Sequence, residues 1–293
     1  MSSVVVRTVR GVARILPAGG VQAAVRVIRR VPGGDRLWRW YEIRRNDAYL
    51  LSFPKCGRTW LRFMLGSVFA RHFDLDHIDV LQLSNLCSAE PRIPVISVNH
   101  DDGPQYKTPA ELAVAKTKYR GKKVILLVRD PRDAIVSMYF HRTRRRRIKN
   151  YEGTLSEFLR MERGSLSSFF AYYNNWLRHR DVPAGFLLLR YEDMHANAFA
   201  ALRAAVDFLG LSEIADEEIA VAAQHGSFEN MRRVEVTEVS RSKKLRPGTV
   251  GDVESYKTRR GKVGGYRDYL SEEDIVYVDE RVRREMDPLY GYR

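Results

Sequence analysis

The chain has 293 residues, 44% of them hydrophobic, which is enough to bury a full core and fits one large domain. Lys and Arg number 50 against 36 Asp and Glu, and this net charge of +14 favours anionic partners. There is no apolar run of about 18 residues, no disulfide framework (only Cys56 and Cys87) and no metal-ligand spacing, so we expect no transmembrane span, a reducing compartment and no metal.

The first 45 residues carry much of the positive charge, with ten Arg against Asp35 and Glu42. Apolar residues fall between the arginines, and Pro and Gly interrupt the pattern at 17–20 and 32–34. Basic amphipathic helices fit this pattern, either lying on a membrane surface or packing on the domain that follows. A cleavable export peptide is not expected, because no uninterrupted apolar core of about 7–15 residues is present.

The segment from Tyr49 to Trp60 predicts a buried strand at 49–53, a Pro/Gly loop and a helix over 58–71. Such a turn directs backbone N–H groups and the positive end of the helix dipole at one point, where Lys55 and Arg58 add full charges. This arrangement favours a phosphate or a similar oxyanion. It is not a Walker A loop, because Lys55 precedes the glycine; a purely structural loop is the alternative.

Two further strands are predicted, at 95–100 and at 124–130, and the second is an apolar run that we expect to be buried on both faces. Pro131 suits the first turn of a helix, which we expect over 132–146. Arg129 ends the strand and Ser137 lies two turns into the helix, at the sheet edge where open α/β folds bind ligands. A guanidinium fork matches a phosphate dianion. The alternative is that Arg129 pairs with a nearby acid and that Ser137 is an ordinary helix residue.

The rest of the chain continues the alternation, with a strand at 186–191 and helices at 154–180, 197–209, 215–223 and 271–285. Strands separated by long helical crossovers predict a single α/β domain with a central parallel sheet flanked by helices. The polar segment 232–258 is predicted to be a long mobile loop that acts as a lid or binds a ligand. The basic run Arg142–Lys149 is either a solvated face or a guide for an anionic acceptor.

Two of these segments resemble motifs of the sulfotransferases that use PAPS (3′-phosphoadenosine 5′-phosphosulfate). The order Pro-Lys-x-Gly-x-Thr-Trp at 54–60 resembles the 5′-phosphosulfate loop of that family. Arg129, followed eight residues later by Ser137, resembles its 3′-phosphate motif.

A third segment, 259–266, resembles the family's Arg-Lys-Gly-x-x-Gly-Asp-Trp loop near the C-terminus. Arg260, Gly265 and Tyr266 stand at its Lys, Asp and Trp positions. Glycines let backbone N–H groups approach a phosphate closely, and the cations neutralise it.

Two weaker correspondences concern the adenine. The strand at 186–191 resembles the one whose Tyr, here Tyr191, contacts the base. Segment 224–231 resembles one that supplies a Thr and a Phe around it. Phe228 is retained, but Gly226 stands where Thr is usual, so a hydroxyl contact is lost.

The resemblance implies a P-loop-NTPase-like sulfotransferase domain over residues 46–293, with PAPS as the sulfuryl donor and no metal. It implies in-line transfer of the sulfuryl group from the donor to the acceptor. In that reaction Lys55 stabilises the leaving 5′-phosphate, and His100, at the end of the strand 95–100, takes the acceptor's proton. The ordinary pKa of His, about 6.5, suits a general base, although a structural His is the alternative. The residues implied to bind the donor are Lys55, Cys56, Gly57, Arg58, Thr59, Trp60, Arg129, Ser137, Tyr191, Phe228, Arg259, Arg260 and Gly261.

One departure from the family concerns the transferred sulfonate. Many members carry a Lys two residues before the His, where this chain has Val98. Arg58, at a position where Thr is common, is a candidate to supply the missing charge. Asp101 and Asp102 are candidates to orient His100 or raise its pKa.

Two other classes of function compete with sulfuryl transfer. A P-loop kinase using ATP and Mg²⁺ would need Gly before Lys and a strand-end Asp for the metal. A non-catalytic membrane- or polyanion-binding protein would account for the basic runs alone. We expect a cytoplasmic enzyme with a small-molecule, sugar or lipid acceptor and no nucleic-acid partner. Peripheral membrane contact through residues 1–45 and the oligomeric state stay open.

Overall fold

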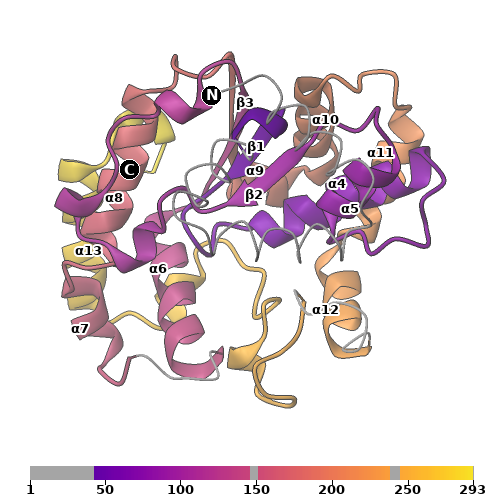
Figure 1. Cartoon of the computed structure of the whole chain (residues 1–293). Helices are drawn as coiled ribbons and strands as arrows, with labels where there is room; N and C mark the ends of the chain where they lie inside the picture. Colours follow the sequence, from indigo (N-terminus) through magenta and orange to yellow (C-terminus); the bar gives the residue numbers. More distant parts are fainter. Residues whose placement is uncertain (1–42, 146–150, 238–244, 293) are drawn as a thin grey trace, which may run out of the picture. The chain divides into compact units, whose positions relative to one another are not determined.

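The centre of the computed structural model, which describes residues 43–145, 151–237 and 245–292, is a sheet of four parallel strands (Figure 1). The strands are β1 (Ala48–Leu51), β2 (Ile96–Asn99), β3 (Lys123–Val128) and β4 (Gly185–Arg190), in the order β2-β1-β3-β4. The four predicted strands and the α/β class are therefore confirmed. The predicted amphipathic helices of residues 1–45 lie almost entirely outside the described residues.

Apolar residues pack on both faces of the sheet, as the continuous hydrophobic strands predict. Leu50, Ile125 and Leu127 belong to one buried cluster, together with residues of α4 (Arg58–His72) and α10 (Ala198–Leu209). Leu51 and Leu126 belong to the other, together with residues of α6 (Pro131–Phe140), α8 (Leu166–Arg178) and α13 (Glu272–Glu285). Figure 1 shows these two helical layers on either side of the strands.

The described helices agree with the predicted ones at most positions, with two breaks. The predicted helix 154–180 is divided after Arg160, because Gly164 has a φ of 70°, which a helix cannot accommodate. The predicted helix 132–146 changes to a π-helical turn at His141–Arg145. The described helices are α4 (Arg58–His72), α5 (Leu83–Ala89), α6 (Pro131–Phe140), α7 (Leu155–Arg160), α8 (Leu166–Arg178), α9 (Tyr191–Ala196), α10 (Ala198–Leu209), α11 (Asp216–His225), α12 (Phe228–Thr237) and α13 (Glu272–Glu285).

The prediction of a loop throughout 232–258 is wrong at its start, where α12 continues to Thr237. Met231 and Glu235 lie one turn apart on this helix and are both buried, which fixes its inner face. Leu245, where the description resumes, is also buried and packs with Met231. The buried residues Glu235 and Leu245 are therefore held against the domain, whereas Val250 is 73% exposed.

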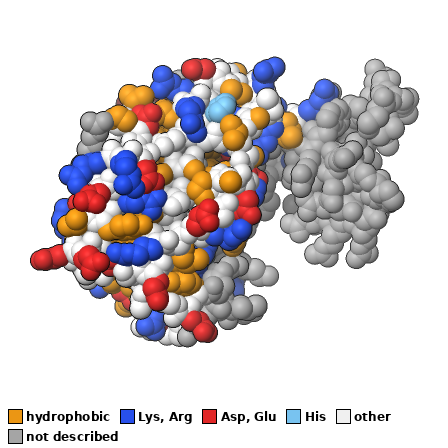
Figure 2. All heavy atoms as spheres, turned by 90° about the vertical axis from the view of Figure 1, so that its left-hand side faces the viewer, with side chains coloured by type: hydrophobic (Ala, Val, Ile, Leu, Met, Phe, Trp, Pro, Cys, Tyr) orange, Lys and Arg blue, Asp and Glu red, His pale blue; other side chains and the backbone are white. Residues whose placement is uncertain are grey.

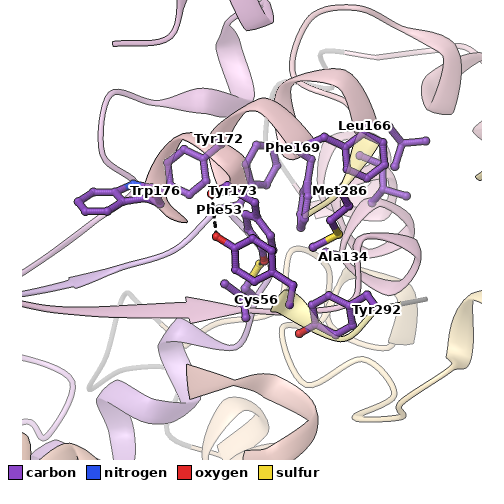
Figure 3. Close-up of a cluster of buried hydrophobic side chains, with 14 of the residues drawn as sticks. Phe53, Cys56, Ala134, Leu166, Phe169, Tyr172, Tyr173, Trp176, Met286 and Tyr292 are labelled. Atoms are coloured by element: carbon purple, nitrogen blue, oxygen red, sulfur yellow. Dashed lines mark hydrogen bonds between the residues drawn. The ribbon is translucent and has the colours of Figure 1, made fainter. Parts of the chain in front are cut away.

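A buried aromatic cluster supports the sheet edge where β1 and β3 end (Figure 3). The Tyr173 hydroxyl lies 3.3 Å from the Cys56 sulfur and accepts a hydrogen bond of 2.7 Å from the Arg129 backbone N–H. One tyrosine therefore ties the loop after β1 to the end of β3. Burial raises the pKa of the Cys56 thiol to about 12, so this sulfur remains a neutral core group.

The face formed by α7, α8 and α13 carries cations and anions side by side (Figure 2). The positive excess of the chain is therefore not concentrated on this face. No helix among the described residues is long and apolar enough to cross a membrane.

Candidate active site

The loop between β1 and α4, residues 52–57 (the phosphate loop), is shaped by two left-handed residues. Lys55 has a φ of 73° and Gly57 a φ of 88°. A Cβ on Gly57 would lie 2.6 Å from the Tyr191 ring, so only glycine fits there. Helix α4 begins at Arg58 with no side-chain cap and no acid in its first turn. Its first N–H groups and dipole are therefore available to an anion.

The phosphate loop opens into a cavity of about 550 Å³. Of the predicted site residues, only Cys56 does not line it, because its side chain points into the core. Residues that lie far apart in the sequence therefore meet at one place. The predicted residues around the cavity are Lys55, Gly57, Arg58, Thr59, Trp60, His100, Arg129, Ser137, Tyr191, Phe228, Arg259, Arg260 and Gly261.

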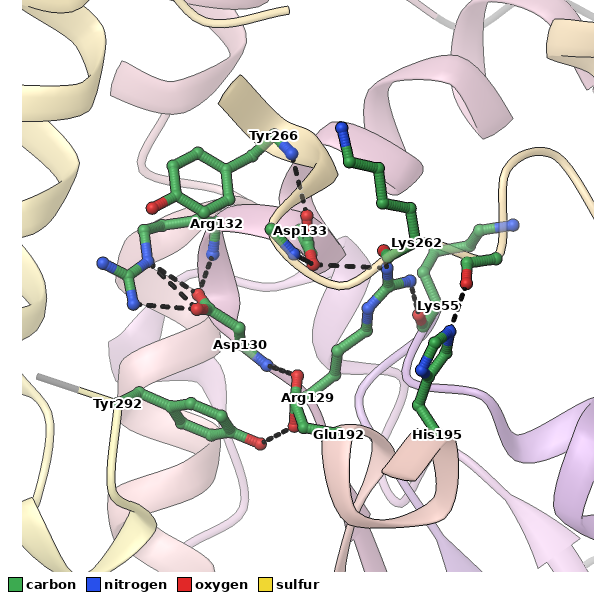
Figure 4. Close-up of polar contacts among 12 residues, drawn as sticks. Lys55, Arg129, Asp130, Arg132, Asp133, Glu192, His195, Lys262, Tyr266 and Tyr292 are labelled. Atoms are coloured by element: carbon green, nitrogen blue, oxygen red, sulfur yellow. Dashed lines mark hydrogen bonds and ion pairs between the residues drawn. The ribbon is translucent and has the colours of Figure 1, made fainter. Parts of the chain in front are cut away.

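Arg129 connects the two loops that the sequence assigned to phosphate (Figure 4). Its guanidinium donates to the Lys55 carbonyl and to the Lys262 carbonyl, both at 3.3 Å, and lies 3.5 Å from the Asp133 carboxylate. The same group lies 4.2 Å from the centre of the Tyr191 ring. Its buried Nε has no hydrogen-bond partner. Arg129 therefore does pair with an acid, Asp133, as the alternative predicted. This pairing still leaves the N–H of its Nε without an acceptor.

Residues 259–266 (the basic glycine loop) are fixed to α6. The Asp133 carboxylate accepts the N–H groups of Gly264 and Tyr266, both at 2.9 Å. Arg259 pairs with Glu254 at 3.0 Å, and the half-exposed Arg260 pairs with the same carboxylate at 3.6 Å. The loop is therefore held at the cavity by a carboxylate that sequence reasoning did not identify.

Aromatic rings line the cavity beside this loop. The Trp60 and Tyr191 rings meet edge to face at 5.6 Å. Phe228 stays 42% exposed, and a Cβ on Gly261 would lie 2.3 Å from its ring. A Cβ on Gly226 would lie 2.4 Å from Met64, which explains why Thr is not accommodated at that position. The exposed face of Phe228 is a surface on which a planar base could stack.

His100 is held in one tautomer at the end of β2. Its Nδ1 lies 2.9 Å from the Ser52 carbonyl, which can only accept, so Nδ1 carries the proton. Its Nε2 therefore accepts from Arg58 Nη2 at 2.7 Å. Burial, and next the positive charge of Arg58, lower the His100 pKa to about 3. His100 is neutral at pH 7, with its lone pair directed at Arg58.

The prediction that Asp101 and Asp102 orient His100 or raise its pKa is wrong. Asp101 is buried and pairs with Lys116 at 2.8 Å and with Lys118 at 2.7 Å. Asp102 pairs with Lys107 at 2.5 Å. Their backbones are left-handed, with φ values of 42° and 69°, and both carboxylates bind these lysines instead of the imidazole.

Two cations that act on the phosphate loop, Lys257 and Arg145, were missed as site residues by the sequence analysis. Lys257 lines the cavity, and its Nζ lies 3.5 Å from Thr59 Oγ1. Arg145 lies within electrostatic reach of Lys55. Burial, and next Arg145 and Lys257, hold the Lys55 pKa well below its usual value. Arg145 belongs to the basic run considered as a guide for an anionic acceptor; residues 146–149 of that run lie outside the described part of the chain.

No group of three or more His, Cys, Asp or Glu side chains within the described ranges has a geometry that would hold a metal ion. A kinase would need an acid at a strand end to bind Mg²⁺, and Asp130, which follows β3, binds Arg132 instead. Both carboxylate oxygens of Asp130 accept from the Arg132 guanidinium, at 2.8–3.1 Å. Asp130 also caps α6 through the Arg132 N–H.

Comparison with known proteins agrees with this geometry. Cytosolic sulfotransferase 17 of Arabidopsis thaliana is 25% identical over 259 residues, which cover 82% of this chain and 74% of that protein. Sulfotransferase 2A6 of Mus musculus is 27% identical over 233 residues, covering 74% of this chain and 81% of the relative.

Solved structures share the fold. Mouse sulfotransferase SULT7A1, crystallised with PAP, has a TM-score of 0.58 at 22% identity and covers 85% of this chain and 86% of its own. Retinol dehydratase, crystallised with androsterone and the inactive cofactor PAP, has a TM-score of 0.57 at 19% identity, with coverage of 82% and 81%. A profile of the sulfotransferase domain matches residues 45–289. The chain therefore belongs to the sulfotransferase family.

Proposed function

We propose that this protein transfers the sulfuryl group of PAPS to a hydroxyl or amine acceptor. The observation that carries the proposal is the convergence of the phosphate loop, Arg129 with Ser137, and the basic glycine loop on one cavity. PAP, which is bound in the structural neighbours, is 3′-phosphoadenosine 5′-phosphate, the donor without its sulfuryl group.

The residues around the cavity fit this donor. The uncapped start of α4 and the left-handed Gly57 suit the 5′-phosphosulfate. The unsatisfied Nε of Arg129 and the hydroxyl of Ser137, which lines the same cavity, suit the 3′-phosphate. The exposed face of Phe228, which lies against Gly261 of the basic glycine loop, suits adenine.

The proposed reaction forms an S–O bond to the acceptor oxygen and breaks the S–O bond to the 5′-phosphate. The donor supplies the sulfuryl group and leaves as PAP. His100 takes the acceptor's proton on Nε2, the nitrogen that carries the lone pair. Lys55 and the N–H groups of the phosphate loop stabilise the charge that develops on the leaving phosphate.

Arg58 has the position needed to replace the charge absent at Val98. It reaches His100 from the first residue of α4, and its buried Nη1 has no hydrogen-bond partner. We propose that the sulfonate draws this guanidinium away from His100. That movement would leave Nε2 open to the acceptor while Arg58 neutralises the transferred group.

We assign the sulfotransferase domain to residues 46–293 and treat residues 1–45 as an appended extension. The family profile, which begins at residue 45, and the compact unit that begins at Ala48 support this boundary. We propose a small-molecule, sugar or lipid acceptor, in keeping with the androsterone in the retinol dehydratase structure. The name of the Arabidopsis relative supports a cytoplasmic enzyme.

Calorimetric titration tests the donor. We expect PAP to bind with an affinity at least tenfold above that of ATP with Mg²⁺, because only PAP offers a 3′-phosphate to Arg129. Tighter binding of ATP–Mg²⁺ would support the kinase alternative. Binding of neither nucleotide would support a non-catalytic polyanion-binding protein.

Replacing Arg129 by alanine should weaken the binding of PAP much more than the binding of its 3′-hydroxyl analogue. Loss of a buried charge-assisted contact costs on the order of 2–5 kcal/mol, and only PAP makes this contact. Because Arg129 also bonds the Lys55 and Lys262 carbonyls, some loss is expected for both nucleotides. The difference between the two losses, measured by calorimetry, is therefore the test. Equal losses would show that Arg129 only supports the loops.

A further inference from the structure

Lys257 reaches the phosphate loop from the C-terminal part of the chain. Its Nζ lies 3.5 Å from the hydroxyl of Thr59, the second residue of α4, and the residue lines the cavity. The ammonium group therefore lies at the uncapped start of α4, where the proposed 5′-phosphosulfate would bind. It approaches from a different part of the chain than Lys55 does.

A buried carboxylate fixes the backbone that presents this lysine. Glu235 of α12 is fully buried, and it accepts the Lys257 N–H at 2.7 Å, the Thr258 N–H at 2.9 Å and the Thr258 hydroxyl at 2.6 Å. Arg232, one turn earlier, donates to the Thr258 carbonyl at 2.7 Å. Helix α12 thus holds residues 257–258 in place, as a positioned active-site group requires.

Cations surround Lys257 from several elements. Arg58 and Arg62 face it from α4, and Arg145 faces it from the π-helical turn. Glu235 opposes Lys257 and pairs with Arg145 at 3.6 Å, and Asp79 opposes Arg62. Lys257 in turn lowers the pKa of Lys55 and of His100. The Nη1 atom of Arg58, the Nε of Arg62 and the Nη1 of Arg145 are buried without a hydrogen-bond partner. Several positive charges gathered around Lys257 in a largely buried site repel one another, and a bound anion would relieve this repulsion.

We propose that Lys257 is a second phosphosulfate-binding lysine, which shares with Lys55 the charge of the leaving 5′-phosphate and is positioned by Glu235. This inference rests on the proposed function, because it assumes that the 5′-phosphosulfate of PAPS binds at the start of α4. It assigns to α12 and residues 245–258 the task of completing the anion site. It also adds to the phosphate a cation that the resemblance to the family does not supply.

The charge state of Lys257 makes this role measurable. Burial, and next Arg145, lower its pKa to about 7 in the free protein, so much of it is neutral above that pH. A bound dianion favours the ammonium form and raises the pKa again. PAP binding above pH 7 should therefore take up a proton at Lys257. Lys55, whose pKa is also lowered, contributes uptake of its own, so the variants are compared with the wild type.

Lys257→Met and Lys257→Arg test the proposal. At pH 8, in two buffers of different ionisation enthalpy, calorimetry gives both the PAP affinity and the protons taken up. We expect Lys257→Met to bind PAP about 10- to 100-fold more weakly, as for loss of one contact to a charged group, and to take up fewer protons. Lys257→Arg, which cannot deprotonate, should recover most of the affinity but not the proton uptake.

Arg233→Met is the matched control, since it removes one exposed cation from α12, the helix that positions Lys257, and should leave both quantities unchanged. Lys257→Met relieves crowding among cations, so it should melt no lower than the wild type. Wild-type affinity and proton uptake in folded Lys257→Met would overturn the inference. So would equal losses of affinity in the Met and Arg variants, which would show a packing role. Failure of the wild type to bind PAP would instead refute the proposed function.

Discussion

Replacing Lys55 by alanine should lower the rate of sulfuryl transfer by about 10²–10³-fold, as when one group that stabilises transition-state charge is lost. Lys55 lies in the phosphate loop at the start of α4, and its buried side chain faces the cavity. The charge it opposes appears on the phosphate oxygen as the S–O bond breaks. The rate constant should therefore fall more than the affinity for PAP.

The backbone of Lys55 requires a control for this experiment. Its φ of 73° is a conformation that alanine rarely adopts, whereas asparagine tolerates it. Lys55→Asn removes the charge with less strain, so both variants should lose rate to a similar degree. If Lys55→Asn turned over like the wild type, the loss in Lys55→Ala would come from the loop backbone, and the role of the ammonium would be refuted.

His100→Ala should remove most transfer to a hydroxyl acceptor and leave PAP affinity nearly unchanged. A general base acts on the acceptor's proton and is worth about 10²–10⁴-fold in rate. His100→Gln is the companion variant, because its amide can still hydrogen-bond the Arg58 guanidinium but cannot accept the proton. A hydroxyl acceptor that turned over normally in both variants would place the base elsewhere.

The pH profile adds an independent test of this assignment. A base must be neutral to accept a proton, so the rate falls as pH drops through its pKa. Burial and Arg58 lower the pKa of His100 to about 3. The fall in rate that protonation of His100 causes should therefore occur at a pH well below the ordinary pKa of His, which is about 6.5. We expect kcat/KM, which reports the free enzyme, to stay level from pH 7 down to about 5. A limb near 6.5 that vanished in His100→Ala would show a solvent-exposed imidazole in the working enzyme.

Sequence patterns predicted the architecture because β1, β3 and β4 are largely continuous apolar runs and both faces of the sheet are covered. The phosphate-loop motif and the spacing of Arg129 and Ser137 then identified most of the cavity lining. These motifs are local, because the residues that form each of them lie within one short stretch of the chain. The parallel sheet brings them together, since the carboxyl ends of β1 and β3 lie at one edge.

Contacts between distant segments could not be predicted in this way. The Glu235 carboxylate binds the backbone 22 residues further along the chain, and no pattern marks an acid as the holder of a loop. The surroundings of His100 were misjudged because sequence neighbours were taken as spatial neighbours. Asp101 turns towards Lys116 and Lys118, while Arg58, 42 positions away, reaches the imidazole. Burial and remote charge set the pKa of His100, and neither is visible in the residues beside it.

A crystal structure of the protein with PAP tests the central claim most directly. We expect the 5′-phosphate at the start of α4, within hydrogen-bond distance of Lys55 and Lys257, and the 3′-phosphate against Arg129 and Ser137. The adenine should stack on Phe228, and His100 should lie on the open side of the phosphate with Nε2 facing the acceptor's position. PAP bound in another cavity, or in this one with the 3′-phosphate away from Arg129, would contradict the account.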